Sequence, residues 1–395
     1  MKIICVNAGS SSLKFKLFNM KNEEVIASGL FERIGISNSD YIIKFNGQKI
    51  EQEIEMNNHL DAVQILLDKL VSLNIISSLS EIDGVGHRLV HGKDKYKDSV
   101  IITDEVIQDL TDYKEFAPLH NPANVLAINA FREVLPNVMM VGVFDTAFHQ
   151  SIEEENYLYA VPREWYSEYG VRKYGFHGTS HRYITETLTS KLGRSDLKII
   201  NCHIGNGGSL SAIKNGKCIN TTMGFTPLSG IMMGTRSGDI DSSIIPYVME
   251  KEGMNANEVI DVLNKQSGLL GVSSKSEDMR DILRGIDEGD TECLLAFNKY
   301  CRIVTNFIAS YYVELEGADI ISFTAGVGEN SYPFRKKVCE NLKCLGIKID
   351  DSKNEEAFGK YAKISTDDSL VDVYVVPTDE ELLIARDTLH FIQNV

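Results

Sequence analysis

The chain has 395 residues, of which 43% are hydrophobic and 24% charged, values typical of globular proteins and unlike those of disordered or fibrous chains. Lys and Arg number 40 and Asp and Glu 56, so the formal net charge is −16. A protein this acidic repels polyanions, so we expect neither nucleic acid nor an anionic membrane surface as a main partner. An anionic substrate would require cationic side chains gathered at its site.

The chain opens with a predicted strand, a turn and a second strand. Small residues from Asn7 to Ser12 let backbone N–H groups converge into an anion-binding nest, and Lys14 adds a positive charge. An ordinary hairpin turn fits the same pattern equally well, so both interpretations stay open here. Apolar residues at helical spacing then predict a helix over residues 57–74.

Charged side chains follow in segments that are rich in Gly or Pro. Arg88 lies between glycines and aliphatic residues, His120 lies in a Pro-flanked loop, and Asp145 ends a buried strand predicted at residues 138–144. His177 and Arg236 also have glycine neighbours. A single buried Arg or His is more often structural, but small neighbours open space around a charged tip. These side chains are therefore candidates for a cationic pocket.

The opening segment has a partner 197 residues further along the chain. Residues 200–210 repeat the pattern of residues 3–13, with Cys5 matched to Cys202 and Ser12 to Ser209. Both copies predict a strand, a Gly/Ser turn and a strand, so we expect a duplicated β-rich unit, one in each domain. The glycine-rich stretch from His203 to Ser209 resembles a phosphate loop, although it matches neither the P-loop nor the dinucleotide fingerprint.

Three helices are predicted in the last third of the chain. Helices are expected over 291–314, 331–342 and 378–392, the last with Thr378 as N-cap and Glu381 completing a capping box. The turn Gly326–Asn330 follows an apolar strand and precedes a helix, an arrangement that can bind a nucleotide or simply connect the two elements. Together, the three glycine-rich segments indicate a nucleotide held between two lobes.

Strands alternating with helices predict an α/β protein with two lobes. We expect an N-terminal lobe over residues 1–150, completed by a C-terminal helix at 380–395, and a nucleotide-binding lobe over 151–379. No apolar run approaches the about 18 residues of a membrane helix. The seven cysteines are odd in number and form no C-x-x-C pair, which fits free thiols in a reducing compartment. We therefore expect a cytoplasmic protein.

Planar arginine forks suit a phosphoryl group in flight, and Asp145 and Glu380 are candidate oxygen ligands for Mg²⁺. The residues thus indicate phosphoryl transfer from a nucleotide to a small acceptor. Over essentially its whole length, the sequence resembles the acetate kinase family, through residues 7–14, 174–181 and 205–209. The resemblance implies a duplicated, actin-like ATPase-domain fold with the nucleotide in the interdomain cleft.

The resemblance also implies reversible, Mg²⁺-dependent transfer of the ATP γ-phosphoryl group to acetate, giving acetyl phosphate and ADP, with Mn²⁺ as an alternative ion. It implies a homodimer, with propionate as a weaker acceptor. Asn7 and Glu380 resemble the metal-site residues, and Asp145, His177 and Arg236 the catalytic ones. Substrate contacts would be Arg88, Val90, Leu119, His120, Phe176 and Pro227. ATP contacts would be Lys14, His203, Ile204, Gly205, Asn206, Gly207, Asp278, Met279, Arg280, Gly326, Val327, Gly328, Glu329 and Asn330.

One residue departs from the family pattern, because Asp379 stands where the family usually has Asn, beside the metal-site glutamate. Acetate is ionised near neutral pH, so no base is needed, and Asp145 is expected to position Mg²⁺ or the acceptor. Direct in-line transfer without a phosphoenzyme is expected.

Three alternatives remain. A propionate kinase would share the motifs, although Val90 favours acetate because a smaller residue would leave room for another methylene. An actin-like or chaperone-type ATPase would need a partner-binding surface, and a non-catalytic nucleotide sensor would not need every catalytic position to be filled.

Overall fold

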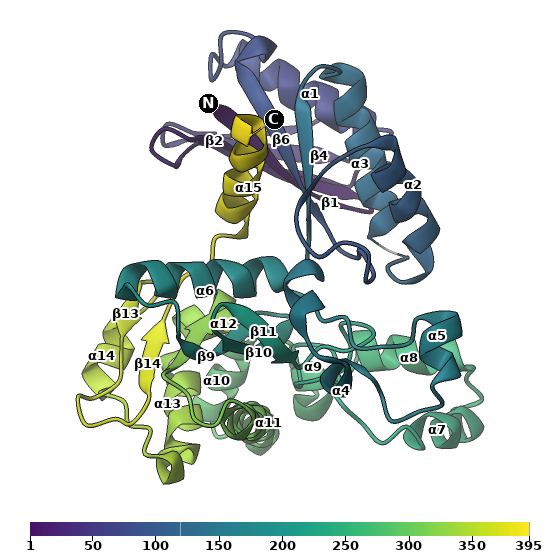
Figure 1. Ribbon diagram of the computed structural model, residues 1–395. Coiled ribbons are helices and arrows are strands. Elements are labelled where there is room, and N and C mark those ends of the chain that lie inside the picture. The colour runs from purple at the N-terminus through teal and green to yellow at the C-terminus, as the bar shows by residue number, and fades with distance from the viewer. Residues whose placement is uncertain (119, 395) are drawn as a thin grey trace. The chain divides into compact units, whose positions relative to one another are not determined.

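The computed structural model describes residues 1–118 and 120–394, and the chain divides into two compact units (Figure 1). The first unit contains Met1–Phe148 together with the residues from Asp379 onward, and the second contains His149–Thr378. The chain passes from the first unit to the second after Phe148 and returns to the first at Asp379. No helix among the described residues has the length and apolar character needed to cross a membrane.

The first unit is built on an eight-stranded sheet with the order β5-β4-β3-β2-β1-β6-β8-β7. Strands β1, β6 and β8 run parallel to one another, whereas the remaining pairs are antiparallel. The strands are β1 (Lys2–Gly9), β2 (Ser12–Asn19), β3 (Glu24–Glu32), β4 (Asp40–Phe45), β5 (Gln48–Glu53), β6 (Ile82–Leu89), β7 (Val100–Ile101) and β8 (Met139–Phe144).

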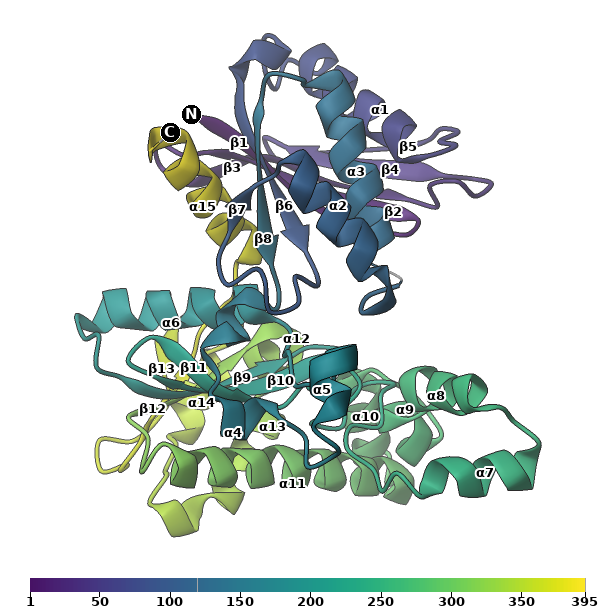
Figure 2. The same cartoon turned by 45° about the vertical axis from the view of Figure 1, so that its right-hand side comes forward.

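Helices cover both faces of this sheet (Figures 1 and 2). They are α1 (His59–Ser72), α2 (Asp104–Asp112) and α3 (Asn121–Val134) on one face, and α15 (Glu380–Asn394) on the other. Strand β1 explains why both faces are needed, because Ile4 and Val6 enter the core beneath α1 and α3, while Ile3 and Cys5 enter the core beneath α15. Its unbroken apolar run is typical of a strand buried on both faces.

Helix α15 lies directly on the backbone of β6. A Cβ added at Gly84 would come 2.7 Å from Ile392 and 2.8 Å from Thr388, and one added at Gly86 would overlap Ile384 and Thr388. Glycine at these positions therefore permits the helix to approach closely. The contact fastens the C-terminal segment to the central strands of the first unit.

The second unit has a six-stranded sheet with the order β11-β10-β9-β12-β14-β13. Its strands are β9 (Lys198–Ile204), β10 (Gly208–Lys214), β11 (Lys217–Thr221), β12 (Ile320–Thr324), β13 (Ala362–Lys363) and β14 (Asp372–Val375). Helices α6 (Gly178–Leu192) and α11 (Thr291–Glu314) lie on opposite faces of this sheet (Figures 1 and 2). The other helices are α4 (Glu154–Tyr157), α5 (Glu164–Tyr169), α7 (Ile244–Glu252), α8 (Ala256–Lys265), α9 (Gly268–Ser273), α10 (Met279–Asp287), α12 (Ala325–Asn330), α13 (Tyr332–Asn341) and α14 (Asp351–Glu356).

The two sheets share one topology, which confirms the duplication predicted from the sequence repeat. The order β3-β2-β1-β6-β8 in the first unit corresponds to β11-β10-β9-β12-β14 in the second. In both, the first three strands are antiparallel neighbours and the last two are parallel to the third. The predicted α/β class with a duplicated unit is therefore observed.

Two local predictions need correction. Residues 326–330, expected to be a turn, belong to the short helix α12, whose first residue, Ala325, has a positive φ of 64°. Thr378 is not the N-cap of the last helix, because Asp379 Oδ1 accepts the hydrogen bond from Leu382 N at 3.2 Å. The backbone N–H of Thr378 donates to Glu329, 3.0 Å away, so the predicted capping box with Glu381 is not formed.

Candidate active site

Arg88 and Asp145 form a two-bonded ion pair in the first unit. Arg88 lies near the carboxyl end of β6 and Asp145 directly follows β8, so the parallel pairing of these strands places both residues at one edge of the sheet. Arg88 Nε donates to Asp145 Oδ1 at 3.1 Å, and Nη2 donates to Oδ2 at 2.6 Å. The Asp145 carboxylate is buried, and its charge raises the pKa of Arg88. The pair holds the guanidinium in a fixed plane.

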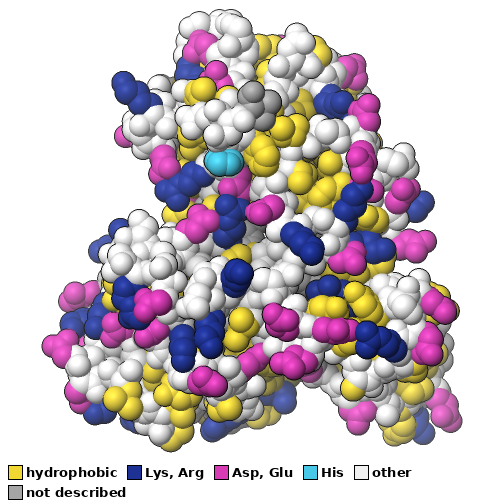
Figure 3. All heavy atoms as spheres, in the orientation of Figure 1, with side chains coloured by type: hydrophobic (Ala, Val, Ile, Leu, Met, Phe, Trp, Pro, Cys, Tyr) yellow, Lys and Arg dark blue, Asp and Glu magenta, His cyan; other side chains and the backbone are white. Residues whose placement is uncertain are grey.

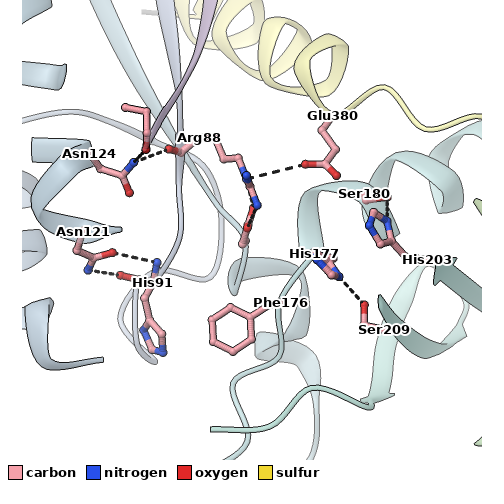
Figure 4. A network of polar contacts seen from close by, with 12 residues as sticks. Arg88, His91, Asn121, Asn124, Phe176, His177, Ser180, His203, Ser209 and Glu380 are labelled. Carbon is pink, nitrogen blue, oxygen red and sulfur yellow. Dashed lines mark hydrogen bonds and ion pairs between the residues drawn. The ribbon is translucent and has the colours of Figure 1, made fainter. Parts of the chain in front are cut away.

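Glu380, the first residue of α15, joins this pair (Figure 4). Its Oε2 lies 3.9 Å from Arg88 Nε. Burial raises the pKa of Glu380 to about 7; Arg88 opposes this shift, and the Asp145 and Glu381 carboxylates add to it. A cation bound here would relieve the repulsion among these acids.

Two lysines on β2 neutralise the carboxylates that flank Glu380. Lys14 Nζ lies 2.6 Å from Glu381, and Lys16 Nζ lies 2.9 Å from Asp379 and 3.2 Å from Glu381. Burial would raise the pKa of Glu381, but Lys14 and Lys16 lower it to about 2. The charge of Asp379, the residue that departs from the family pattern, is thus balanced within the first unit. Lys14, predicted to contact ATP, is ion-paired with Glu381.

The predicted metal ligands are chemically suited to Mg²⁺. Asn7 lies on β1 opposite Lys14, and Glu380 begins the helix that packs on β1, so both belong to the first unit. Each offers the oxygen atoms that Mg²⁺ prefers, and Mg²⁺ commonly takes only one or two protein ligands alongside water and substrate phosphates. Among the described residues no group of three or more His, Cys, Asp or Glu could hold a metal alone. Asn7 and Glu380 therefore fit a Mg²⁺ site in which water and the substrate phosphates supply the remaining ligands.

Two asparagines that the sequence analysis did not single out support this edge of the sheet. The buried Asn124 donates through Nδ2 to the carbonyl groups of Ala8, at 3.4 Å, and Arg88, at 3.3 Å. Asn121 exchanges hydrogen bonds with the backbone of His91, at 3.3 and 3.1 Å (Figure 4). Both lie in the first turn of α3, and Asn121 directly precedes Pro122, a pattern typical of a helix N-terminus.

The predicted substrate contacts of the first unit lie close in sequence to these groups. Val90 directly follows β6 and is buried, whereas His120 is exposed immediately before α3. Leu119, also predicted to contact the substrate, lies outside the described residues. Phe176 and Pro227 belong to the second unit, where Phe176 is buried and the Pro227 carbonyl accepts a hydrogen bond from Arg236 Nη1 at 2.9 Å.

Histidines gather in the second unit at the start of α6. His177 has a φ of 57°, in the left-handed region, and such strain in a residue other than glycine is characteristic of functional sites. Its ring stacks on His203 with centroids 4.2 Å apart, and its Nδ1 lies 2.9 Å from Ser209 Oγ (Figure 4). His203 is held by Ser180, whose Oγ lies 2.8 Å from the ring. Backbone and side chain of His177 are both fixed.

Arg236 lies against the glycine loop that follows β9. A Cβ on Gly207 would come 3.3 Å from Arg236 Nη2, so only glycine leaves the guanidinium its present place. Burial lowers the pKa of Arg236, and among the described residues no carboxylate forms an ion pair with it. The partly buried positive charge is thus available for an anion.

A cavity of about 640 Å³ lies within the second unit. Residues from three of the predicted ATP segments line it together: Gly205, Asn206, Asp278, Met279, Arg280, Gly326, Val327 and Asn330. Its volume falls within the range of small-molecule sites. His203, Ile204, Gly207, Gly328 and Glu329 are not among the residues that line it.

Glu329 and the buried Arg335 brace one wall of this cavity. Glu329 Oε1 accepts from Ala325 N at 2.8 Å, and Arg335 Nη1 donates to the Gly328 and Glu329 carbonyls, each at 2.9 Å. Asn354 completes the shell of Arg335, accepting bonds at 2.7 Å through its side chain and its backbone. Glu329 thus shapes the cavity from behind.

The surface of the protein carries charges of both signs. On the face shown in Figure 3, acidic and basic side chains are interspersed. The buried or partly buried cations Arg88 and Arg236 are therefore local features within an acidic protein. Each unit thus contributes one such arginine, Arg88 in the first and Arg236 in the second.

Comparisons with known proteins agree over nearly the whole chain. Residues 2–386 match the model of the acetokinase family. The acetate kinase of Bacillus subtilis is 52% identical over 390 residues, covering 98% of each chain. The crystal structure of Porphyromonas gingivalis acetate kinase matches with a TM-score of 0.96 and 44% identity over 99% of both chains. A propionate kinase from Francisella tularensis matches with a TM-score of 0.93 and 38% identity, over 98% of this chain and 99% of that one. The chain therefore belongs to the acetokinase family.

Proposed function

We propose that this protein is a phosphotransferase that moves the γ-phosphoryl group of ATP to acetate, reversibly and with Mg²⁺, giving acetyl phosphate and ADP. The observation that carries the proposal is the cavity in the second unit, because segments around residues 205, 279 and 327 meet there although they lie far apart in sequence. Membership of the acetokinase family supplies the acceptor class.

The side chains support a mechanism of charge neutralisation. Acetate is already ionised at neutral pH, and the Asp145 carboxylate is engaged by Arg88, so Asp145 positions the arginine and no base is needed. Arg88 binds the acetate carboxylate through its fixed plane. Arg236 and His177 stabilise the transferring phosphoryl group more strongly in the transition state than in the ground state. This difference lowers the barrier for direct in-line transfer.

Asn7 and Glu380 would hold Mg²⁺, which would neutralise charge on the ATP phosphates. Lys16 and Lys14 keep the neighbouring acids paired, so the charge offered to the metal remains that of Glu380. A homodimer and a cytoplasmic location complete the proposal, the latter supported by cysteines that are all free and, except for Cys344, buried.

A hydroxamate assay for acyl phosphate tests the proposal. The purified protein, ATP and Mg²⁺ are incubated with acetate, propionate or butyrate in parallel. We expect acetate to give the highest kcat/KM, followed by propionate. A preference for propionate would favour the second candidate, a propionate kinase, which the similarity to the Francisella enzyme supports. ADP release that does not depend on any acid would contradict both assignments and favour an ATPase.

A further inference from the structure

We propose that a hydrogen-bond relay running Ser322–Asn201–His181–Ser209–His177 holds His177 in one tautomer, with Nδ1 as acceptor and the hydrogen on Nε2. The relay lies wholly within the second unit. The effect of the relay on catalysis rests on the role proposed above for His177. The tautomer itself follows from the hydrogen bonds and does not depend on that role.

The relay joins strands β12, β9 and β10 to α6. Ser322 Oγ donates to Asn201 Oδ1 at 2.7 Å, and Asn201 Nδ2 lies 2.8 Å from His181 Nδ1. His181 Nε2 and His177 Nδ1 lie 2.8 and 2.9 Å from the same atom, Ser209 Oγ. Asn201, His181, Ser209 and Ser322 are all 0% exposed. No water can replace a partner without rearrangement.

The direction of each bond follows from the number of hydrogens available. Asn201 presents its amide nitrogen to His181, and an amide nitrogen only donates, so His181 Nδ1 accepts. Burial lowers the pKa of His181 well below its ordinary value, with His149 and His203 adding to the effect, so the ring is neutral. Its one hydrogen is therefore on Nε2, which donates to Ser209 Oγ.

Ser209 passes this direction to His177. Within the described chain its hydroxyl has two recorded hydrogen-bond partners, His181 and His177. Because His181 donates, the hydroxyl hydrogen goes to His177 Nδ1, since a buried hydroxyl without an acceptor is costly. His177 then carries its hydrogen on Nε2. An N–H at Nε2 is the group that can donate to a phosphoryl oxygen.

The spacing within α6 makes this possible. His177 and His181 are separated by one helical turn, and His181 N donates to the His177 carbonyl at 2.9 Å, so both rings reach one hydroxyl. Stacking on His203 at 4.2 Å fixes the plane of the His177 ring. His181, Ser209 and Asn201 are therefore positioning residues that act through His177.

Long-range ¹H–¹⁵N spectra of the full-length protein with ¹⁵N-labelled histidine test the relay without any substrate. The His177 signals are assigned by their loss in His177→Gln. We expect the Nε2–H pattern for His177 and His181. An Nδ1–H pattern or an imidazolium at His177 in the wild-type protein at neutral pH would overturn the proposal, whether or not the protein phosphorylates acetate.

Two variants and one control sharpen this test. Ser209→Ala removes the link and is expected to leave His177 as a mixture of tautomers. Asn201→Asp replaces the donor with an acceptor, so the relay reverses and His177 moves to the Nδ1–H form. Ser211→Ala truncates a buried serine on the same face of β10, bonded to Thr221 at 3.0 Å, and should leave the His177 spectrum unchanged. An unchanged His177 spectrum in a folded Ser209→Ala protein would contradict the relay.

Kinetics then connect the relay to catalysis. In Ser209→Ala we expect kcat to fall about tenfold or more, with less than about a twofold change in KM for ATP or acetate, because the tautomer matters in the transition state. Ser211→Ala should retain kcat. A changed tautomer with an unchanged kcat would leave the relay standing and contradict the proposed role of His177, so the two failures are distinguishable.

Discussion

Arg236 and Arg88 show how two arginines in one protein can have different tasks. Arg88 is paired with a buried carboxylate, so its charge is largely balanced and its orientation fixed. Arg236 is held by the Pro227 carbonyl, and burial lowers its pKa. An arginine held by a neutral acceptor keeps a positive charge that no neighbouring carboxylate neutralises. Arg236 is therefore the better suited of the two to bind the anionic phosphoryl group.

Arg236→Ala is therefore expected to lower kcat by at least about a hundredfold, comparable to the loss of one oxyanion donor. Steady-state kinetics of the purified variant, with its fold checked by circular dichroism, measure the effect. Arg194→Ala, which removes a surface arginine paired with Asp196, serves as the control and should retain normal kcat. A near-normal kcat in Arg236→Ala would refute the assignment.

Val90→Ala is expected to shift the acceptor preference toward propionate. Val90 is buried next to Arg88, the proposed acetate contact, and a smaller side chain leaves room for one methylene. The change should be worth about 1–3 kcal/mol in relative transition-state binding. The ratio of kcat/KM for the two acids measures it, and an unchanged ratio would count against Val90 as a pocket wall.

His87 makes the stability of the first unit sensitive to acid. Burial lowers its pKa from 6.5 to about 3, and its Nε2 has no hydrogen-bond partner within the described chain. Protons bind the unfolded ring first, so this contribution is complete above pH 6.5 and is lost as the pH falls toward 3. Between pH 7 and pH 5 the loss is about 2 kcal/mol.

The conservative variant His87→Gln tests this sensitivity, because glutamine does not titrate. The free energy of unfolding of both proteins is measured by denaturant titration at several pH values. Wild type should lose more stability than the variant on acidification. Parallel pH profiles would show that His87 is not the responsible group.

At the scale of elements, the approach of α15 to β6 is the most constrained contact. Gly86→Ala would force its Cβ onto Ile384 and Thr388, and overpacking of this kind costs about 1–3 kcal/mol. Gly326→Ala is the control, because nothing lies within 4 Å of the added Cβ. Thermal or denaturant unfolding without nucleotide compares the two. Equal stability of Gly86→Ala and wild type would mean that the helix can withdraw without cost.

Elements with strong local patterns were predictable from the sequence. The predicted helix over 291–314 coincides with α11, and the two strand–turn–strand copies became β1–β2 and β9–β10. The start of α15 was missed because Thr378 and Asp379 are both good N-caps. In the fold the Thr378 hydroxyl lies 2.9 Å from Ser180 Oγ, and Asp379 accepts the bond from Leu382 N. Asn124 was missed because its partners, Ala8 and Arg88, are brought to it by folding.

The residues of the candidate site likewise fall into those that could be predicted from the sequence and those that could not. Residue types and glycine flanks singled out Arg88, Asp145, His177 and Arg236, since charge in an apolar setting is visible in sequence. The supporting groups were not visible. The hydrogen bond between Ser209 and His181 forms only because folding brings β10 and α6 together. Glu329 was predicted to contact ATP, but in the fold its carboxylate accepts backbone N–H groups. Which residues of the cavity contact ATP stays a prediction.

For the whole molecule, the chain path makes the first unit depend on residues from Asp379 onward. Truncation after Thr378 would uncover Ile3, Cys5, Val141 and Val143, which α15 buries. We expect amide hydrogen exchange to quicken in β1, β6 and β8 while β9, β10 and β12 remain protected, since the second unit has its own sheet. Unchanged protection in β1, β6 and β8 would show that α15 is dispensable.

The same path sets an order of events during synthesis. Domains usually fold in the sequence in which they leave the ribosome. Here every residue of the second unit emerges before the helix that closes the first, because α15 is translated last among the described elements. The first unit is thus begun before the second but completed after it. Until α15 is made, one face of its central strands stays uncovered, and a chaperone could bind there.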